Sequence, residues 1–239
     1  MRDRLGLTVV EGPGAFVAAC DAGAVRAVIH CPRLLTAAVA AKLVRYRKRD
    51  GVPVVKVSPE RFRVLSETPR ASGVAAIVAR RCVSLGDLDP AAGPFRLVLE
   101  SVRSPGNLGT LFRTAAAFGA AGVVLVGPRV DPFDPAAVRA SMGAVFRLDV
   151  ARVSLAGLRH WKATHRVPLV GTSPAAAERF DRVPFPRPSL IALGDERAGL
   201  SPGLLAACDR GVSIPMRAGC DSLNLGVACG LVMHAAAHA

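Results

Sequence analysis

Short aliphatic runs alternate with longer stretches of mixed hydrophobic and polar residues along the whole chain. Such runs, bounded by Gly, Pro or Asp, are typical of buried strands, whereas the longer stretches are typical of helices. Over the first ninety residues the pattern predicts strands at Thr8–Val10, Val25–Ile29, Val52–Val57 and Val74–Val78. It predicts helices at Gly12–Ala22, Leu34–Arg49 and Pro59–Leu65. Strands separated by helices in this way indicate a small α/β sandwich.

The same alternation continues on a larger scale after a Gly-, Asp- and Pro-rich segment at residues 87–94, which we predict to be a linker. Predicted strands lie at Leu97–Glu100, Val123–Val126, Val167–Val170, Leu190–Leu193 and Val212–Ile214. Predicted helices lie at Leu108–Phe118, Leu155–Thr164, Pro202–Ala207 and Leu223–Ala236. Nearly continuous apolar strands are typical of a parallel sheet covered on both faces. We therefore expect one α/β domain at residues 1–86 and a second, parallel-sheet domain at residues 95–239.

Composition excludes a membrane protein. Apolar residues make up 51% of the chain, but they are largely Ala and Val, and aromatic residues make up only 5%. No apolar run reaches the roughly 18 to 20 residues needed to span a bilayer. The first residues carry Arg2, Asp3 and Arg4 and lack the apolar core of a signal peptide. We expect a soluble cytoplasmic protein.

Charge points to a polyanionic partner. The chain has 31 Lys and Arg against 18 Asp and Glu, a formal net charge of +13, and Arg greatly exceeds Lys. Arg suits bidentate contacts with phosphate, so nucleic acid is the expected partner. An alternative is that a GC-rich genome favours Arg and Ala codons.

The six cysteines lack the paired spacing of a zinc site, so we predict reduced thiols and no bound metal. Cys220 lies in the loop before Ser222, and we interpret it as a small loop residue rather than a nucleophile.

Polar residues follow three of the predicted strands, and the carboxyl ends of parallel strands are where ligands bind in α/β sheets. After the first strand comes Ser104-Pro105-Gly106-Asn107, with Arg113 six residues beyond Asn107. The Pro-Gly turn leaves backbone N–H groups available for a polar ligand. Both Asn107 and Arg113 can then face the cleft. Alternatively, Asn107 is a helix N-cap and Arg113 a solvated charge.

The other two loops carry Glu196, after Gly194-Asp195, and Ser222 with Asn224, at the start of the last helix. A carboxylate at a strand end can accept a hydrogen bond from a ribose or anchor a cationic side chain. Alternatively, Asp195 and Glu196 are acids in a first helical turn, where the helix dipole favours them. Ser222 and Asn224 could likewise be N-caps of the last helix. Taken together, the three loops predict one site at a sheet edge.

These loops resemble the signature motifs of the SpoU (TrmH-type) branch of the SPOUT RNA methyltransferases. Ser104 to Arg113 resembles the family's Asp-Pro-x-Asn-x-Gly-x-x-x-Arg motif, with Ser104 where Asp is usual. Gly194, Glu196, Gly199 and Leu200 resemble its Gly-x-Glu-x-x-Gly-Leu motif, and Ile-Pro-Met followed by Ser-Leu-Asn stands at 214–216 and 222–224. The likeness extends over residues 96–238, and the segment 140–146 also resembles a connecting segment of the family.

The resemblance implies a fold and a cofactor. The second domain would contain a deep trefoil knot, and its knotted loops would hold S-adenosylmethionine in a bent form. The implied cofactor-binding residues are Gly171, Thr172, Leu193, Gly194, Ile214, Met216 and Leu223. The first domain is similar to the small substrate-binding domains of the family, which resemble ribosomal proteins that bind kinked RNA. Family members are homodimers with an active site near the subunit interface.

The implied reaction is methyl transfer to a ribose 2′-hydroxyl of RNA. Arg113 would organise the target phosphate and hydroxyl, since a guanidinium stays protonated and is a poor base. Asn107 would hold Arg113 or the ribose, and Glu196 would fix Asn107 or Arg113. Ser222 and Asn224 would contact the cofactor and the nucleotide. The implied catalytic residues are Asn107, Arg113, Glu196, Ser222 and Asn224.

Several alternatives stay open from the sequence. The first domain and the basic stretch 45–49 favour ribosomal RNA over tRNA, although that stretch could equally be a solvated helix end. A base-methylating enzyme and an inactive RNA-binding protein of the same fold are the remaining candidates. Methylation of ribosomal RNA could also confer antibiotic resistance, but no residue demonstrates it.

Overall fold

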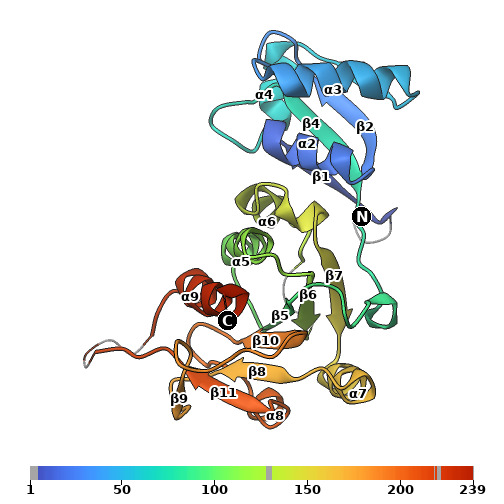
Figure 1. Cartoon of the computed structure of the whole chain (residues 1–239). Helices are drawn as coiled ribbons and strands as arrows, with labels where there is room; N and C mark the ends of the chain where they lie inside the picture. The colour runs from blue at the N-terminus through green and yellow to red at the C-terminus, as the bar shows by residue number, and fades with distance from the viewer. Residues whose placement is uncertain (1–4, 128–130, 218, 220–221, 239) are drawn as a thin grey trace.

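The computed structural model describes residues 5–127, 131–217, 219 and 222–238, and it places two sheets in this part of the chain (Figure 1). The first sheet has four strands in the order β1-β4-β2-β3. Strand β4 is antiparallel to β1 and β2, whereas β2 and β3 are parallel, so the sheet is mixed. The strands are β1 (Leu7–Glu11), β2 (Val25–His30), β3 (Val54–Lys56) and β4 (Val74–Ala79).

Helices cover both faces of this small sheet. They are α2 (Pro13–Asp21), α3 (Ala38–Arg49) and α4 (Pro59–Leu65). Phe16 of α2 and Val44 of α3 share a core with Val74 of β4. The next residue of the strand, Ala75, packs instead with Phe62 of α4. Successive strand residues point to opposite faces, so α4 lies on the face opposite to α2 and α3.

The second sheet has seven strands in the order β7-β6-β5-β10-β8-β11-β9, and all of its pairs are parallel. This confirms the predicted α/β fold with a parallel sheet. The strands are β5 (Phe95–Glu100), β6 (Gly122–Val126), β7 (Asp149–Val153), β8 (Leu169–Thr172), β9 (Glu178–Arg179), β10 (Ser189–Leu193) and β11 (Arg210–Ser213). The trefoil knot stays a prediction.

Two hydrophobic cores lie on the two faces of the second sheet. Leu97 of β5 packs into one core, and the next residue, Val98, packs into the other. The helices on the first side are α5 (Pro105–Ala117), α6 (Pro135–Ala140) and α9 (Leu225–His238) (Figure 1). Those on the second side are α7 (Leu155–His165) and α8 (Pro202–Leu205). The strands are buried from both sides, which explains their continuous apolar sequence.

The segment predicted to be a linker is packed against the second sheet. Already at Val83 the backbone N–H donates to the carbonyl of Val150 at 2.9 Å, and Leu88 is buried in one of the two cores. The buried Arg96 of β5 donates to the carbonyl of Asp89. These contacts anchor the chain between the two sheets.

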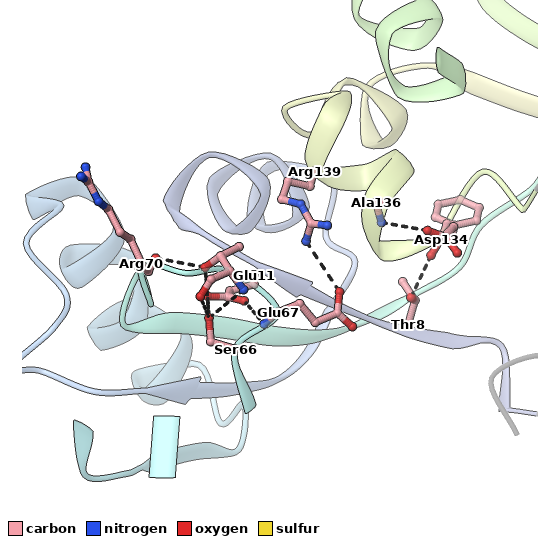
Figure 2. A network of polar contacts seen from close by, with 10 residues as sticks. Thr8, Glu11, Ser66, Glu67, Arg70, Asp134, Ala136 and Arg139 are labelled. Carbon is pink, nitrogen blue, oxygen red and sulfur yellow. Dashed lines mark hydrogen bonds and ion pairs between the residues drawn. The ribbon is translucent and has the colours of Figure 1, made fainter. Parts of the chain in front are cut away.

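Side-chain contacts also join the small sheet to the larger one. Arg80 pairs with Asp131 at 2.8 Å, and the hydroxyl of Thr8 donates to the carbonyl of Phe133 at 2.9 Å. Figure 2 shows a third contact, in which Arg139 of α6 reaches Glu67 at 3.6 Å. The first domain is therefore docked on the second through several polar contacts.

Glu11, at the end of β1, holds the segment that carries Glu67. Its carboxylate accepts hydrogen bonds from the hydroxyl of Ser66 at 2.7 Å, the backbone N–H of Glu67 at 3.1 Å and the hydroxyl of Thr68 at 3.2 Å (Figure 2).

Among the described residues, no helix has the length and apolar character that crossing a bilayer requires.

Candidate active site

The loops singled out from the sequence lie at one edge of the second sheet. Strands β5, β10, β8 and β11 are neighbours and run in the same direction, so their carboxyl ends share this edge. The loops that follow β5, β10 and β11 carry the three motifs. Ligands bind at such an edge in open α/β sheets.

Helix α5 begins earlier than the sequence pattern predicts, and this changes the role of Asn107. The helix starts at Pro105, and Ser104 is its N-cap, with its hydroxyl accepting the N–H of Asn107 at 3.4 Å. The alternative that Asn107 caps the helix is therefore wrong. Its side chain instead crosses to the next loop and donates from Nδ2 to Oε1 of Glu196.

The loop after β10 is closed by two backbone hydrogen bonds of 2.9 Å between Asp195 and Gly199. Gly194 packs directly against this closure, and a Cβ added there would lie 2.1 Å from the carbonyl carbon of Gly199. Only glycine fits at that position. Helix α8 begins later, at Pro202, so Asp195 and Glu196 do not lie in a first helical turn as the alternative interpretation held.

Asp195 organises the same loop from inside. One carboxylate oxygen accepts the backbone N–H groups of Arg197 at 3.0 Å and Ala198 at 3.1 Å, and the other accepts Nε of Arg103 at 2.7 Å. The N–H groups of Ala198 and Arg197, together with the Arg103 guanidinium, lower the pKa of Asp195 below its usual value. The loops after β5 and β10 are thus joined twice, through Asn107–Glu196 and through Arg103–Asp195.

A pocket of about 160 Å³ opens between these loops and the loop after β11. Half of its lining residues are apolar, and the polar ones supply hydroxyl groups, two carboxylates and one guanidinium. Such a mixture is typical of a site for a small organic cofactor. The lining residues are Thr172, Ser173, Pro174, Leu193, Gly194, Asp195, Glu196, Arg197, Gly199, Val212, Ile214, Met216, Ser222, Leu223, Leu225 and Ala228.

The structure places most of the expected cofactor-binding residues around this pocket. Thr172, Leu193, Gly194, Ile214, Met216 and Leu223 line it, and Gly171 does not. Gly171 is buried behind the pocket, where an added Cβ would lie 2.5 Å from Sγ of Cys208. It therefore allows close packing behind β8. The roles of the lining residues stay predictions.

Only some of the five expected catalytic residues line the pocket. Glu196 and Ser222 line the pocket, and Asn107 reaches it through Glu196. Asn224 acts as a cap, because its Oδ1 accepts the N–H of Gly226 at 2.9 Å, one residue into α9. Cys220, in the same loop, lies outside the described residues.

Arg113 lies apart from the pocket of its own chain. Six residues correspond to about 9 Å along a helix and leave the two side chains on different faces. Neither Asn107 nor Arg113 is among the residues that line the pocket, so the expectation that the two face one cleft stays a prediction. Arg113 is exposed and makes no hydrogen bond or ion pair with the residues that the structure describes.

Arg103 and Asp195 were not expected at this site. Asp195 stands beside Gly194 in a motif, but its acidic side chain was equally compatible with a helix start. Arg103 precedes the first motif by one residue, and only its charge at a strand end could have singled it out.

Comparison with known proteins supports a family assignment. Residues 94–234 match the model of the SpoU rRNA Methylase family. The chain is 37% identical over 141 residues to the uncharacterized tRNA/rRNA methyltransferase slr1673 of Synechocystis, which covers 59% of this chain and 52% of that protein. The chain thus spans about half the length of that relative.

Two further similarities extend beyond the matched region. The chain is 33% identical over 190 residues to the 23S rRNA (uridine(2479)-2′-O)-methyltransferase of Streptomyces viridochromogenes, covering 76% of this chain and 66% of the relative. The crystal structure of an AdoMet-bound rRNA methyltransferase from Sinorhizobium meliloti is similar with a TM-score of 0.88 and 30% identity. That likeness covers 99% of this chain and 89% of the other.

Proposed function

The chain belongs to the SpoU rRNA methylase family and is an RNA ribose 2′-O-methyltransferase that uses S-adenosylmethionine, and we propose that its substrate is ribosomal RNA. The relative from Streptomyces viridochromogenes is named for such a substrate, and its likeness extends into the first domain. The net charge of +13 suits a polyanion. We infer further that the protein works in the cytoplasm.

The observation that carries the assignment of the site is the meeting of Glu196, Asn107 and Ser222 at one apolar pocket. The lining residues fit S-adenosylmethionine, because aliphatic side chains suit the adenosine and hydroxyl groups suit its polar ends. Gly194 fits as well. The close contact with Gly199 requires a glycine at this position, so no side chain projects from this part of the pocket wall. When bound, the cofactor supplies an electrophilic methyl group.

The residues of the chain would act by orientation and electrostatics. Glu196 holds the amide of Asn107 in one orientation, which leaves the amide oxygen available to a ribose hydroxyl. Ser222, at the pocket wall, would contact the cofactor, and Asn224 would fix the start of α9 beside it. Arg113 would stabilise the negative charge that develops as the hydroxyl loses its proton.

We place Arg113 in a site completed by a second subunit, because it is exposed and does not line the pocket of its own chain. Helix α9 carries an exposed apolar stripe, with Val227 52% and Leu231 39% exposed, four residues apart on one face. An uncovered stripe of this kind is expected at an interface between copies of the chain. The homodimer would thus bring Arg113 of one subunit toward the pocket of the other.

Incubation of the purified protein with labelled S-adenosylmethionine and either total ribosomal RNA or total tRNA tests the proposal. Ribose methylation protects the adjoining phosphodiester from alkali, so the label should appear in alkali-resistant dinucleotides from ribosomal RNA. Label in the tRNA pool alone would overturn the choice of substrate. Label in alkali-labile nucleotides would indicate base methylation, and cofactor binding without transfer to either pool would indicate an inactive RNA-binding protein.

Mixed dimers test the shared site. A subunit with Arg113→Ala and a subunit with Glu196→Ala should each be inactive as a homodimer. When the two are mixed, one intact composite site should form, and about a quarter to a half of the wild-type activity should return. No recovery in dimers shown to be mixed would contradict a site built from two subunits.

A further inference from the structure

A second pocket, of about 270 Å³, adjoins the first at the same sheet edge. Its lining consists of Val102, Arg103, Asp195, Glu196, Arg197 and Leu225. Four of these six residues also line the first pocket, so the segment around Glu196 forms a wall between the two. Any group in the second pocket would therefore lie next to a ligand in the first.

The carboxylates in this wall are already occupied by protein donors. Asp195, whose side chain is 8% exposed, accepts two backbone N–H groups and Nε of Arg103. Glu196 accepts the amide of Asn107. Asp195, with both of its carboxylate oxygens accepting hydrogen bonds, needs no cation from a ligand.

The Arg103 guanidinium is held by one nitrogen and open at the other two. Only its Nε is used, at 2.7 Å from Asp195, and the side chain is 65% exposed. Within the described part of the chain, its Nη1 and Nη2 atoms make no hydrogen bond. These two groups form the planar fork that suits phosphate oxygens. Because Asp195 restrains the side chain, part of the entropy cost of binding a phosphate has already been met.

The ion pair between Arg103 and Asp195 has little value for stability alone. An ion pair with one partner 65% exposed contributes little to stability, because water screens it. The two N–H groups from the backbone already satisfy one oxygen of Asp195. The placement of Arg103 beside the cofactor pocket therefore has more bearing on a ligand than on folding.

We propose that Arg103 binds a backbone phosphate of the RNA substrate at the second pocket and that Asp195 positions it for this contact. The proposal rests on the proposed function, since it assumes an RNA substrate. It assigns Arg103 a part in substrate binding that differs from that of Arg113, whose loss should affect turnover. Arg197, also exposed at this pocket, would lie beside the same phosphate.

Equilibrium binding of ribosomal RNA at several salt concentrations tests the proposal without requiring turnover. In Arg103→Ala the dissociation constant should rise about tenfold, the loss expected for one charge-assisted contact. The slope of log affinity against log salt should flatten by about 0.7 to 0.9, the value for one lost phosphate contact. Affinity for S-adenosylmethionine, measured by calorimetry, should stay unchanged.

Three further variants separate positioning from charge. Arg103→Lys keeps the charge and should keep the salt slope while losing part of the affinity, because an ammonium lacks the fork. Asp195→Asn should weaken RNA binding less than Arg103→Ala, since the guanidinium remains but is no longer held. Arg179→Ala is the matched control, because Arg179 lies on β9, outside both pockets, and forms a 2.7 Å ion pair with Asp181. It should leave RNA binding unchanged.

Two results would overturn the proposal. One is an unchanged RNA affinity and salt slope in Arg103→Ala. The other is a loss of S-adenosylmethionine affinity in Arg103→Ala with an unchanged salt slope of RNA binding. In that case the Arg103–Asp195 ion pair would only stabilise the loop after β10. Failure of the proposed function looks different, because the wild-type protein would then transfer no methyl group to the ribose of ribosomal RNA, whether or not Arg103 is intact.

Discussion

Asn107, Asn224 and Ser104 show why polar residues at helix starts are ambiguous in a sequence. All three can cap a helix, and the structure assigns the cap to Ser104 and Asn224 while Asn107 binds Glu196. The difference arises because Pro105 fixes the first helical residue, which moves Asn107 into the first turn. The partner of Asn107 is 89 residues away, so no local pattern could predict it.

Arg113→Ala is expected to reduce methyl transfer to RNA by at least a hundredfold, because the developing negative charge would lose its stabilising cation. The affinity for S-adenosylmethionine should stay within about twofold of wild type, since Arg113 lies outside the pocket. Arg159→Ala on α7 is the control, as that side chain is also exposed but lies on the other side of the sheet. Full activity in Arg113→Ala would refute the assignment.

Asp195→Asn should change the pH dependence of stability. Because the pKa of Asp195 is lowered in the folded protein, its carboxylate stabilises the fold above the usual Asp pKa of about 3.9. That contribution is lost as the pH falls through the lower folded pKa. Urea unfolding should therefore show the wild type more stable than Asp195→Asn at pH 7, and the difference should shrink toward pH 3. A gap that is the same at both pH values would contradict this explanation.

At the scale of elements, long and uniformly apolar segments were predictable and short or mixed ones were not. Strand β7 was missed because Asp149 and Arg152 interrupt its apolar residues, and β9 has only two residues. Helix α6 has six residues, too few to show a helical period. These elements are defined by pairing and packing with distant segments, which the sequence pattern does not report.

Helix packing explains one motif glycine without reference to a ligand. At Gly109 in α5, an added Cβ would lie 2.4 Å from the carbonyl oxygen of Ala137 and 2.5 Å from Cβ of Ala140, both in α6. Gly109→Ala should therefore lower the free energy of unfolding by about 1 to 3 kcal/mol, the usual cost of overpacking. Chemical denaturation measures this directly.

Gly14→Ala is the matched control for that measurement. Gly14 also lies in a helix, α2, but nothing lies within 4 Å of an added Cβ. Alanine there should raise stability by up to about 1 kcal/mol through its helix propensity. Equal effects of the two substitutions would show that the contact between α5 and α6 is looser than the structure indicates.

At the scale of the whole molecule, Leu231→Asp should convert a dimer into monomers. A charge in the centre of an apolar interface would lose its hydration without gaining a partner. Leu205→Asp on α8 is the control, because Leu205 is also 39% exposed but lies on the opposite side of the sheet. Analytical ultracentrifugation distinguishes the two. An unchanged dimer in Leu231→Asp, or a monomeric wild type, would argue against an interface at α9.

The docking of the first domain has a consequence for RNA selection. Arg80–Asp131, Thr8–Phe133 and Glu67–Arg139 join the small mixed sheet to the domain that carries the pocket. These contacts fix the position of the first domain relative to the pocket. If the first domain binds one structural landmark of the RNA, the pocket can reach only a nucleotide at a fixed distance from that landmark. The distance between the two would then select the nucleotide to be modified. An RNA with one extra base pair between landmark and target would then bind normally and go unmethylated.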